Sequence, residues 1–178
     1  GNDRTEAAVL KMLTLSRDKA TESPDEVLGK LNIVPLTISY EIDPCDVMKA
    51  RELAYGAGYE KAPFEDLESI AQGIQGQKGH VHIHFGTPLN QPSLSVPVAV
   101  SLIDDAMVAN YRLFKTNFWA CEALGHTVDE SDCDAAEASI TQSAFFARFD
   151  ELSDAERQQA LEMYARPVLN VMASKNKV

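Results

Sequence analysis

The chain has 178 residues, and 16 lysines and arginines against 27 aspartates and glutamates give it a formal net charge of −11. This length predicts one domain, or at most one and a half, and a hydrophobic content of 45% excludes wholesale disorder. The net negative charge disfavours a surface that binds a nucleic-acid backbone or binds an anionic membrane over a large area. A small basic pocket remains compatible with it.

Cysteine content and hydropathy indicate the compartment. Cys45, Cys121 and Cys133 are an odd number of cysteines at irregular spacing, which indicates no disulfide framework and favours a reducing compartment. No signal-peptide pattern is present, and no apolar run approaches the roughly 18 residues of a membrane-spanning helix. We therefore expect a cytoplasmic protein. The first residue is Gly1 rather than Met, which favours a truncated or processed product over a native start.

The first half of the chain predicts helices around one strand. Apolar residues recur at helical spacing over residues 4–16, and residues 18–24 are a polar loop. Residues 31–42 are apolar and β-branched, which predicts a largely buried strand with Pro35 at an edge, a bulge or the strand start. Asp43, Pro44 and Asp46 signal a helix to about residue 54, and Pro63 opens another that ends near residue 76.

The second half combines one strand with several helices. Residues 79–86 alternate strictly, as in a strand with two distinct faces. Helical patterns cover residues 98–114, 117–124 and 134–149. Ser153 and Glu156 form a capping box for a helix that reaches residue 164 or 165, where Pro167 limits it. Two strands rarely form an independent sheet, so we predict an α/β fold with a partial mixed sheet of two or three strands, about five or six helices and a helical C-terminal part.

Three histidines in the second predicted strand form the most conspicuous candidate site. His80, His82 and His84 occupy alternate positions, so their imidazoles point to one face, as zinc ligands on a strand do. The alternative, which we favour, is a half-exposed strand with a histidine-rich polar face, because no carboxylate lies nearby in the sequence.

Other chemistry-bearing residues give weaker signals. A loose set has no regular metal-ligand spacing, and it comprises Cys121, His126, Asp129 and Cys133. The many carboxylates fall mostly in helix first turns and on polar faces, where capping and solvation explain them. No nucleophile elbow and no glycine-rich phosphate loop occurs. Arg4 lies at a helix entrance, where it could help to hold a phosphate, but spacing alone favours a solvated arginine.

Four segments of the chain, taken in order, carry a resemblance to a known family. They are Asn2-Asp3-Arg4-Thr5 with Val9-Leu10-Lys11-Met12; residues 33–41 with Asp43-Pro44-Cys45-Asp46 and Lys49-Ala50; Gly79 to Gly86 through Val81, His82 and Phe85; and residues 110–117. Together they resemble the second half of a bacterial glycerophospholipid acyltransferase, related to glycerol-3-phosphate and lysophosphatidate acyltransferases. The resemblance extends to about Leu124, and a weaker match follows at Tyr164-Ala165-Arg166-Pro167.

The resemblance implies transfer of a fatty acyl group from acyl-CoA or acyl carrier protein to a glycerophosphate hydroxyl in phospholipid synthesis, with no cofactor. In the family, a His-x4-Asp pair supplies the general base, and a Glu-Gly-x-Arg-type motif contacts the phosphate of the acceptor. An apolar block with a proline shapes the substrate pocket and resembles residues 33–36. The implied substrate-binding residues of this chain are Arg4, Ile33, Val34 and Pro35.

The sequence departs from the family at the catalytic motifs. The positions five residues beyond the four histidines hold Phe85, Thr87, Leu89 and Ser131, so no His-x4-Asp pair exists. The arginine motif would precede Gly1. His82 matches a family strand position, whereas His80 and His84 do not. We therefore expect residues 1–97 to be the C-terminal half of an acyltransferase α/β domain and residues 98–178 a helical extension, inactive on their own.

Partners and a competing class of function follow from these patterns. The parent enzyme would bind acyl-CoA or acyl carrier protein and a glycerophosphate acceptor, and it would be cytoplasmic, with peripheral membrane contact left open. Unpaired strand edges are adhesive, so a homodimer through the strands is a second hypothesis. The competing class is a non-catalytic binding or interaction module, for instance one that holds a metal through His80, His82 and His84.

Overall fold

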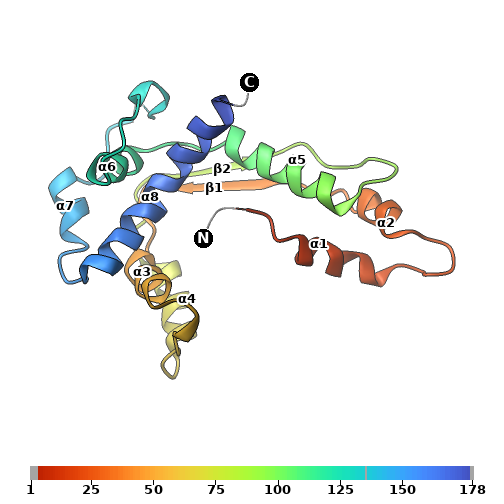
Figure 1. The fold of residues 1–178 in the computed structure, drawn as a ribbon, viewed down its shortest axis with the longest axis horizontal. Helices are drawn as coiled ribbons and strands as arrows, with labels where there is room; N and C mark the ends of the chain where they lie inside the picture. The colour runs from red at the N-terminus through yellow and green to blue at the C-terminus, as the bar shows by residue number, and fades with distance from the viewer. Residues whose placement is uncertain (1–3, 135, 177–178) are drawn as a thin grey trace. The chain divides into compact units, whose positions relative to one another are not determined.

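The structure is a computed structural model that describes residues 4–134 and 136–176 (Figure 1). In these residues it contains eight α-helices, three short 3₁₀ helices and two strands. The elements are α1 (Ala7–Leu13), η1 (Thr14–Ser16), α2 (Pro24–Lys30), β1 (Leu36–Tyr40), α3 (Asp46–Tyr55), η2 (Gly56–Gly58), α4 (Glu65–Gln75), β2 (Val81–Phe85), α5 (Val96–Ala109), α6 (Lys115–Ala123), η3 (Glu130–Asp132), α7 (Gln142–Ala147) and α8 (Asp154–Lys175). The predicted class, an α/β fold with a partial sheet of two or three strands and a helical C-terminal part, is confirmed; the sheet has two antiparallel strands rather than a mixed set, and there are more helices than the five or six expected.

The chain forms two compact units that alternate along the sequence. The first unit comprises residues up to Ile38 together with Ile83–Tyr111, and the second comprises Ser39–His82 together with residues from Arg112 onward. The boundary expected between residues 97 and 98 falls within α5, which belongs to the first unit. The assignment of residues 1–97 to an acyltransferase domain stays a prediction.

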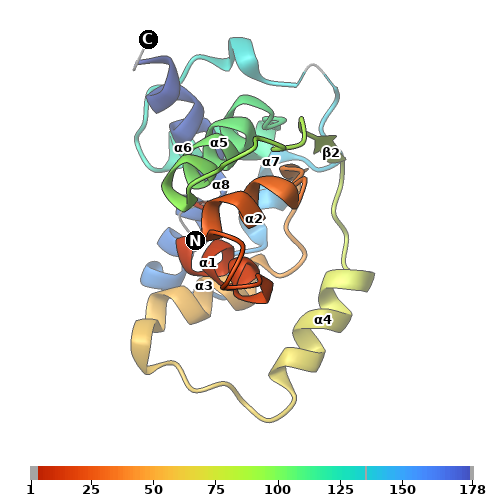
Figure 2. The same ribbon diagram turned by 90° about the vertical axis from the view of Figure 1, so that its right-hand side faces the viewer.

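Helices α1, α2 and α5 enclose the core of the first unit. Its buried side chains are aliphatic: Leu10, Leu28, Leu94, Ala99 and Ile103. Helix α2 was not predicted, although its start carries a clear signal, because Ser23 and Glu26 form a capping box directly before and after Pro24. The two views of the ribbon show α1 and α2 close to α5 (Figures 1 and 2).

The second unit is organised along the long helix α8, which packs against α3 and α6. An aromatic cluster fills its centre: the Phe145 ring lies edge-on to Phe149 at 5.3 Å and to Tyr164 at 4.9 Å between ring centroids. Trp119 of α6 is 6.0 Å from Phe145. Such edge-on arrangements suit the aromatic quadrupole and add to the burial of large apolar surface.

Helix α8 does not end at residue 164 or 165, so that prediction is wrong. It continues through Pro167 to Lys175. A proline inside a helix removes one backbone hydrogen bond. Tertiary packing offsets that loss, because Tyr164, Ala165 and Val168 on both sides of the proline are buried against the neighbouring helices.

The helix predicted over residues 134–149 is also mostly wrong, since only Gln142–Ala147 are helical. The preceding segment is held instead by backbone and side-chain contacts with distant residues. Asp134 pairs with Arg112, Cys133 forms a bridge with Leu113, and Ser139 donates to Glu41. Thr141 then caps α7 by accepting from the Ala144 amide.

The two strands are antiparallel. The Gly86 amide donates to the Pro35 carbonyl at one end, and the Glu41 amide donates to the His80 carbonyl at the other. This register places residue 38 opposite residue 83 and residue 36 opposite residue 85.

No helix in the described part of the chain is both long enough and apolar enough to cross a bilayer.

Strand β1 was predicted to be largely buried, and its apolar side chains are not. Thr37 and Ser39 are buried, whereas Leu36 and Ile38 remain 44% and 41% exposed. The covered face is polar because Ser39 uses it to bond across the unit, its hydroxyl accepting from the Arg112 amide. Since side chains alternate along a strand, that choice turns the apolar residues outward.

Candidate functional site

The second unit contains a buried polar centre, and Glu41 is its first component. Glu41 follows β1 and is 1% exposed. One carboxylate oxygen, Oε2, accepts from the His80 amide at 2.8 Å and from the Ser139 hydroxyl at 2.7 Å, and Oε1 accepts from the Ser139 amide at 2.9 Å. Gly79 lies beside it with a φ of +61°, and a Cβ there would be 2.4 Å from Oε2. Only glycine fits that position.

The environment of Glu41 keeps its carboxylate ionised. Burial raises its pKa, but the hydrogen bonds from the His80 and Ser139 amides, the Ser139 hydroxyl and the His80 ring outweigh burial, so the pKa is lowered overall. His80 Nδ1 lies 2.9 Å from Oε2. Because a carboxylate only accepts, Nδ1 carries the hydrogen, and the half-exposed ring stacks on Phe114.

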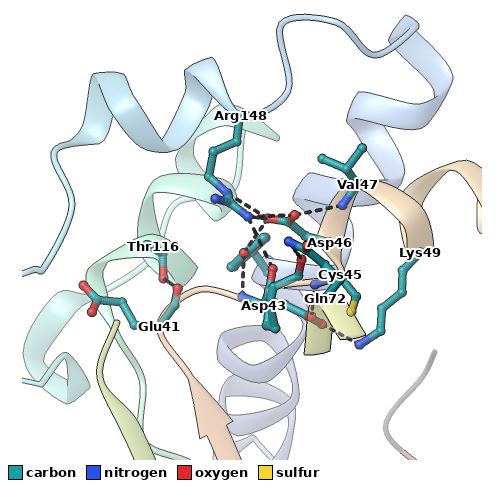
Figure 3. A network of polar contacts seen from close by, with 11 residues as sticks. Glu41, Asp43, Cys45, Asp46, Val47, Lys49, Gln72, Thr116 and Arg148 are labelled. Atoms are coloured by element: carbon teal, nitrogen blue, oxygen red, sulfur yellow. Dashed lines mark hydrogen bonds and ion pairs between the residues drawn. The ribbon is translucent and has the colours of Figure 1, made fainter. Parts of the chain in front are cut away.

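Asp46 is the second component, and it begins α3. Its side chain is 1% exposed and receives the Arg148 guanidinium in a two-pronged ion pair, with Nε 2.9 Å from Oδ2 and Nη2 2.8 Å from Oδ1. The Val47 amide donates to Oδ1 at 2.8 Å. Figure 3 shows the guanidinium and this amide converging on the carboxylate. The sequence placed Asp46 in the first turn of a helix, which is where it lies, but gave no sign that Arg148 and Tyr164 of α8 bury it.

Tyr164 of α8 connects Asp46 to the backbone before α3. Its hydroxyl donates to Asp46 Oδ2 at 2.8 Å and accepts from the Asp43 amide at 2.9 Å. Burial, followed by the adjacent Asp46 charge, raises the pKa of Tyr164 well above its ordinary value. Tyr164 therefore remains a neutral phenol at neutral pH.

Helix α6 links the two carboxylates. Thr116 Oγ1 donates to the Glu41 carbonyl at 2.7 Å, and Asn117 Nδ2 donates to the Tyr164 carbonyl at 2.8 Å. Figure 3 shows Thr116 directed at the backbone of Glu41. The polar centre, defined here as Glu41, Asp46, Thr116, Asn117, Arg148 and Tyr164, therefore joins β1, α3, α6, α8 and the end of α7.

The polar centre holds the second unit together and offers little for catalysis. The oxygens of both carboxylates are occupied by donors from the chain, so neither could accept a proton from a substrate without breaking those bonds. His80 differs, because Nε2 has no partner among the described residues and half of its side chain is exposed.

An open pocket of about 440 Å³ lies beside Asp46. Its walls are mixed in polarity, and the lining residues are Pro44, Asp46, Val47, Met48, Glu68, Gln72 and Arg148. Arg148 is the cation among them, and it is already paired with Asp46. Because Glu68 adds a further negative charge, the pocket does not suit a phosphate group.

The residues predicted to bind substrate all belong to the first unit. Arg4 is exposed and precedes α1, and the α1 N-cap residue, Glu6, makes no side-chain cap. Asn2 and Asp3, the predicted caps, lie outside the described residues. Ile33 pairs with Leu89 and packs on the aliphatic core, and Pro35 is buried, whereas Val34 is exposed. Their role in binding stays a prediction.

The candidate metal ligands do not assemble. His80 bonds to Glu41, and His82 and His84 lie on the half-buried face of β2, so the sheet turns its histidines inward and its apolar residues outward. In the part of the chain that the structure describes, no three histidine, cysteine, aspartate or glutamate side chains are close enough to hold a metal.

Burial, together with the nearby Glu122 charge, raises the pKa of the Cys121 thiol to about 11, which keeps that thiol protonated and inert.

The buried carboxylates are the residues that pattern reading missed. A signal for Glu41 was present, because strand alternation places it on the same face as Thr37 and Ser39, and all three are buried. For Asp46 no local signal existed, since its partner Arg148 is 102 positions away.

Comparison with known proteins adds no relative: no family model, curated protein or solved structure matches this chain.

Proposed function

We propose that this chain is the C-terminal portion of a glycerolipid-type acyltransferase, which moves a fatty acyl group from acyl-CoA or acyl carrier protein to a glycerophosphate hydroxyl. One observation carries the proposal: residues from three of the four segments that resemble the family, and from the C-terminal match, meet at the polar centre. Glu41 and Asp46 come from the second segment, Thr116 and Asn117 from the fourth, and Tyr164 from the C-terminal match.

Direct bonding between these segments strengthens the resemblance. The third segment joins as well, through Gly79 and the His80 amide on Glu41. Four short matches at separate places in a sequence are individually weak. Residues of the second, third and fourth segments bond to one another, so these three matches describe a single structural feature, whereas the first segment lies in the other unit.

In this proposal the chain supplies a frame and part of the substrate pocket rather than the chemistry. The sequence lacks a His-x4-Asp pair, and both buried carboxylates are engaged by the fold. The general base and the phosphate-binding arginine of the parent would precede Gly1. Arg4 and the Ile33-Val34-Pro35 block would then extend that site from the first unit, and any membrane contact would be a peripheral property of the parent.

The test compares the chain with the longer protein encoded upstream of it. We expect a His-x4-Asp pair and a Glu-Gly-x-Arg motif in the preceding coding sequence. We also expect thiol release from acyl-CoA, dependent on glycerol 3-phosphate or lysophosphatidate, for the longer protein and not for residues 1–178. The matched control is the longer protein with the upstream histidine changed to alanine.

Two outcomes would contradict the proposal. One is a preceding sequence that lacks both motifs. The other is acceptor-dependent thiol release by residues 1–178 alone that persists through repurification, because base catalysis would then come from residues to which the fold gives no such role.

A further inference from the structure

We propose that the outward apolar face of α4 is a docking surface for a helix of another protein, one whose apolar stripe is flanked by lysines or arginines. The inference is independent of the proposed function, because it rests on α4 and its immediate surroundings. All of these residues belong to the second unit.

Helix α4 turns its polar side toward the rest of the second unit, at whose edge it lies (Figure 2). The Ser69 carbonyl accepts from the Cys45 thiol at 3.4 Å. Glu65, Ser69 and Gly73 share that side of the helix, and they are its half-buried residues. None of the residues of α4, all of which the structure describes, is buried. The apolar side, which an amphipathic helix of a globular protein normally buries, is left to solvent.

The apolar side of α4 is a continuous stripe. Leu67, Ile70 and Ile74 follow one another at spacings of three and four residues, and they are 62%, 59% and 74% exposed. With Phe64, directly before the helix, they present on the order of 500 Å² of apolar surface, within the range of about 300–600 Å² that is often functional on a monomer. A helix of 11 residues is marginal in water without packing, so a partner that covers the stripe would stabilise α4.

The backbone at Phe64 is a second, independent indication of a binding surface. Its φ is +71°, in the left-handed region that bulky side chains rarely adopt. Strained residues of this kind cluster at binding and switch sites. The Phe64 ring is 74% exposed, so burial of the ring within the described part of the chain does not offset the strain. Burial of the ring against a partner would.

The charges beside the stripe select a basic partner. Helix α4 contains three carboxylates, Glu65, Asp66 and Glu68, and no lysine or arginine. Asp66 pairs with Lys61, whereas Glu68 has no partner among the described residues. The rim of the stripe is therefore acidic, and charge complementarity favours a partner with a basic rim.

The open pocket of about 440 Å³ gives a cation of the partner a place beside the stripe. Glu68 lines this pocket together with Asp46 and Arg148, whose charges cancel in their ion pair. The Glu68 carboxylate leaves the pocket with a net negative charge. A lysine or arginine next to the apolar stripe of a bound helix would enter the pocket and pair with Glu68, while the two stripes pack together.

The same charges disfavour the other occupants of an apolar helix face. A second copy carries the same carboxylates and the same net charge of −11, so it would bring two acidic rims together. An anionic lipid surface is repelled for the same reason. A neutral lipid surface offers no net positive charge to the acidic rim.

Two synthetic peptides of about 18 residues, long enough to form a helix, test the proposal on the purified chain. Both carry the same leucine stripe, and their polar face is lysine in one and glutamate in the other. We expect the lysine peptide to bind with a dissociation constant on the order of 10–100 µM, because an interface below about 1,200 Å² is weak. Binding should weaken as salt is raised, and the amides of α4 should gain protection from hydrogen exchange. The glutamate peptide should not bind.

Two pairs of variants separate the stripe from the charge. Ile70→Gln should weaken binding of the lysine peptide about tenfold, whereas Leu15→Gln, at a similarly exposed apolar position of the first unit, should not. Glu68→Gln should weaken binding by a smaller factor and reduce its salt dependence, whereas Glu137→Gln, at another exposed acidic position, should change neither. All four side chains are exposed, so each variant should keep the circular dichroism spectrum of the wild type.

Three outcomes would overturn the proposal. The first is equal binding of the two peptides, or binding that Ile70→Gln leaves unchanged. The second is flotation of the wild type, and not of Ile70→Gln, with vesicles of neutral phosphatidylcholine, which would assign the face to a lipid surface. The third is self-association of the wild type that Ile70→Gln abolishes, which would assign the face to a second copy.

Discussion

The two units of this protein bury different chemistry. The core of the first unit is aliphatic, built from leucine, isoleucine and alanine on α1, α2 and α5. The core of the second unit combines an aromatic cluster with two carboxylates, Glu41 and Asp46, that are almost fully buried. Aliphatic packing is non-directional and tolerates volume-conserving changes. Buried carboxylates tolerate few changes, because each oxygen needs a donor at a defined place.

This difference shows how one short chain specifies two arrangements. In the first unit, the apolar stripes on the helices are sufficient to bring them together. In the second, Asp46 requires Arg148 and Tyr164, and Glu41 requires His80 and Ser139. A buried ion pair contributes little net stability compared with a well-packed apolar pair, yet removing one partner is costly. The second unit should therefore be more sensitive to polar substitutions than the first.

The largest expected effect is that of Asp46→Ala. It leaves Arg148 and the Tyr164 hydroxyl without their acceptor, and we expect the free energy of unfolding to fall by about 3–5 kcal/mol. Urea unfolding followed by fluorescence of Trp119, the single tryptophan and a neighbour of Phe145, measures it. The control is Asp150→Ala, whose partner Arg157 is 3.9 Å away at the surface. Its loss should be below about 0.5 kcal/mol, and equal losses in the two variants would contradict the comparison.

The corresponding change in the first unit is Leu28→Ala. Leu28 is fully buried, so the cavity should cost about 3 kcal/mol. Hydrogen exchange should accelerate in α1, α2 and α5, while the amides of α6 and α8 keep their protection. Leu31→Ala, at an exposed position just after α2, is the matched control and should cost less than about 1 kcal/mol. Uniform acceleration across both units would show that the two cores unfold as one.

The smallest effect is a pH dependence that Glu41 gives to the second unit. Its folded pKa is lowered, so the unfolded state binds more protons between the folded value and an unfolded value of about 4.3. Its stabilising contribution is present above the unfolded value and is lost as pH falls through the folded value. At pH 7, Glu41→Gln should cost about 1–2 kcal/mol.

The pH test compares urea unfolding of wild type and Glu41→Gln at pH 7 and below pH 4. The difference between them should narrow in acid, because a protonated glutamate and a glutamine are both neutral. Glu137→Gln, at an exposed position, controls for the loss of one surface charge. A difference that stays constant across this range would mean that the Glu41 carboxylate is not held ionised by its donors.

Local signals gave correct predictions where a few neighbouring residues decide the outcome. The capping box of Ser153 and Glu156 starts α8, and the alternation of residues 79–86 is strand β2. A helix from Pro44 to about residue 54 was foreseen, and α3 covers residues 46–55, with Asp43 accepting from the Cys45 amide just before it. These features depend on residues within one turn or one short strand, so the local sequence is sufficient to predict them.

Distant contacts explain the predictions that were wrong. A helical pattern begins at residue 134, but the bonds of Asp134 to Arg112 and Leu113, and of Ser139 to Glu41, replace it with an irregular segment in the described residues. Pro167 should end a helix, but packing on α3 and α6 carries α8 past it. In both places, tertiary contacts outweigh a local preference of about 1–3 kcal/mol.

The sequence by itself determined that helices accompany a partial sheet of few strands, where α8 starts, where β2 lies, and the net acidity of the chain. Only the tertiary structure decided which face of β1 is covered and which carboxylates are buried. The reason is physical: a strand offers two faces of equal geometry, and the choice depends on donors supplied elsewhere in the chain. Ser39 and Glu41 face inward, where the Arg112 amide bonds to the Ser39 hydroxyl and Ser139 bonds to the Glu41 carboxylate, and Thr37 lies on the same face by alternation. The apolar residues of both strands are exposed as a consequence.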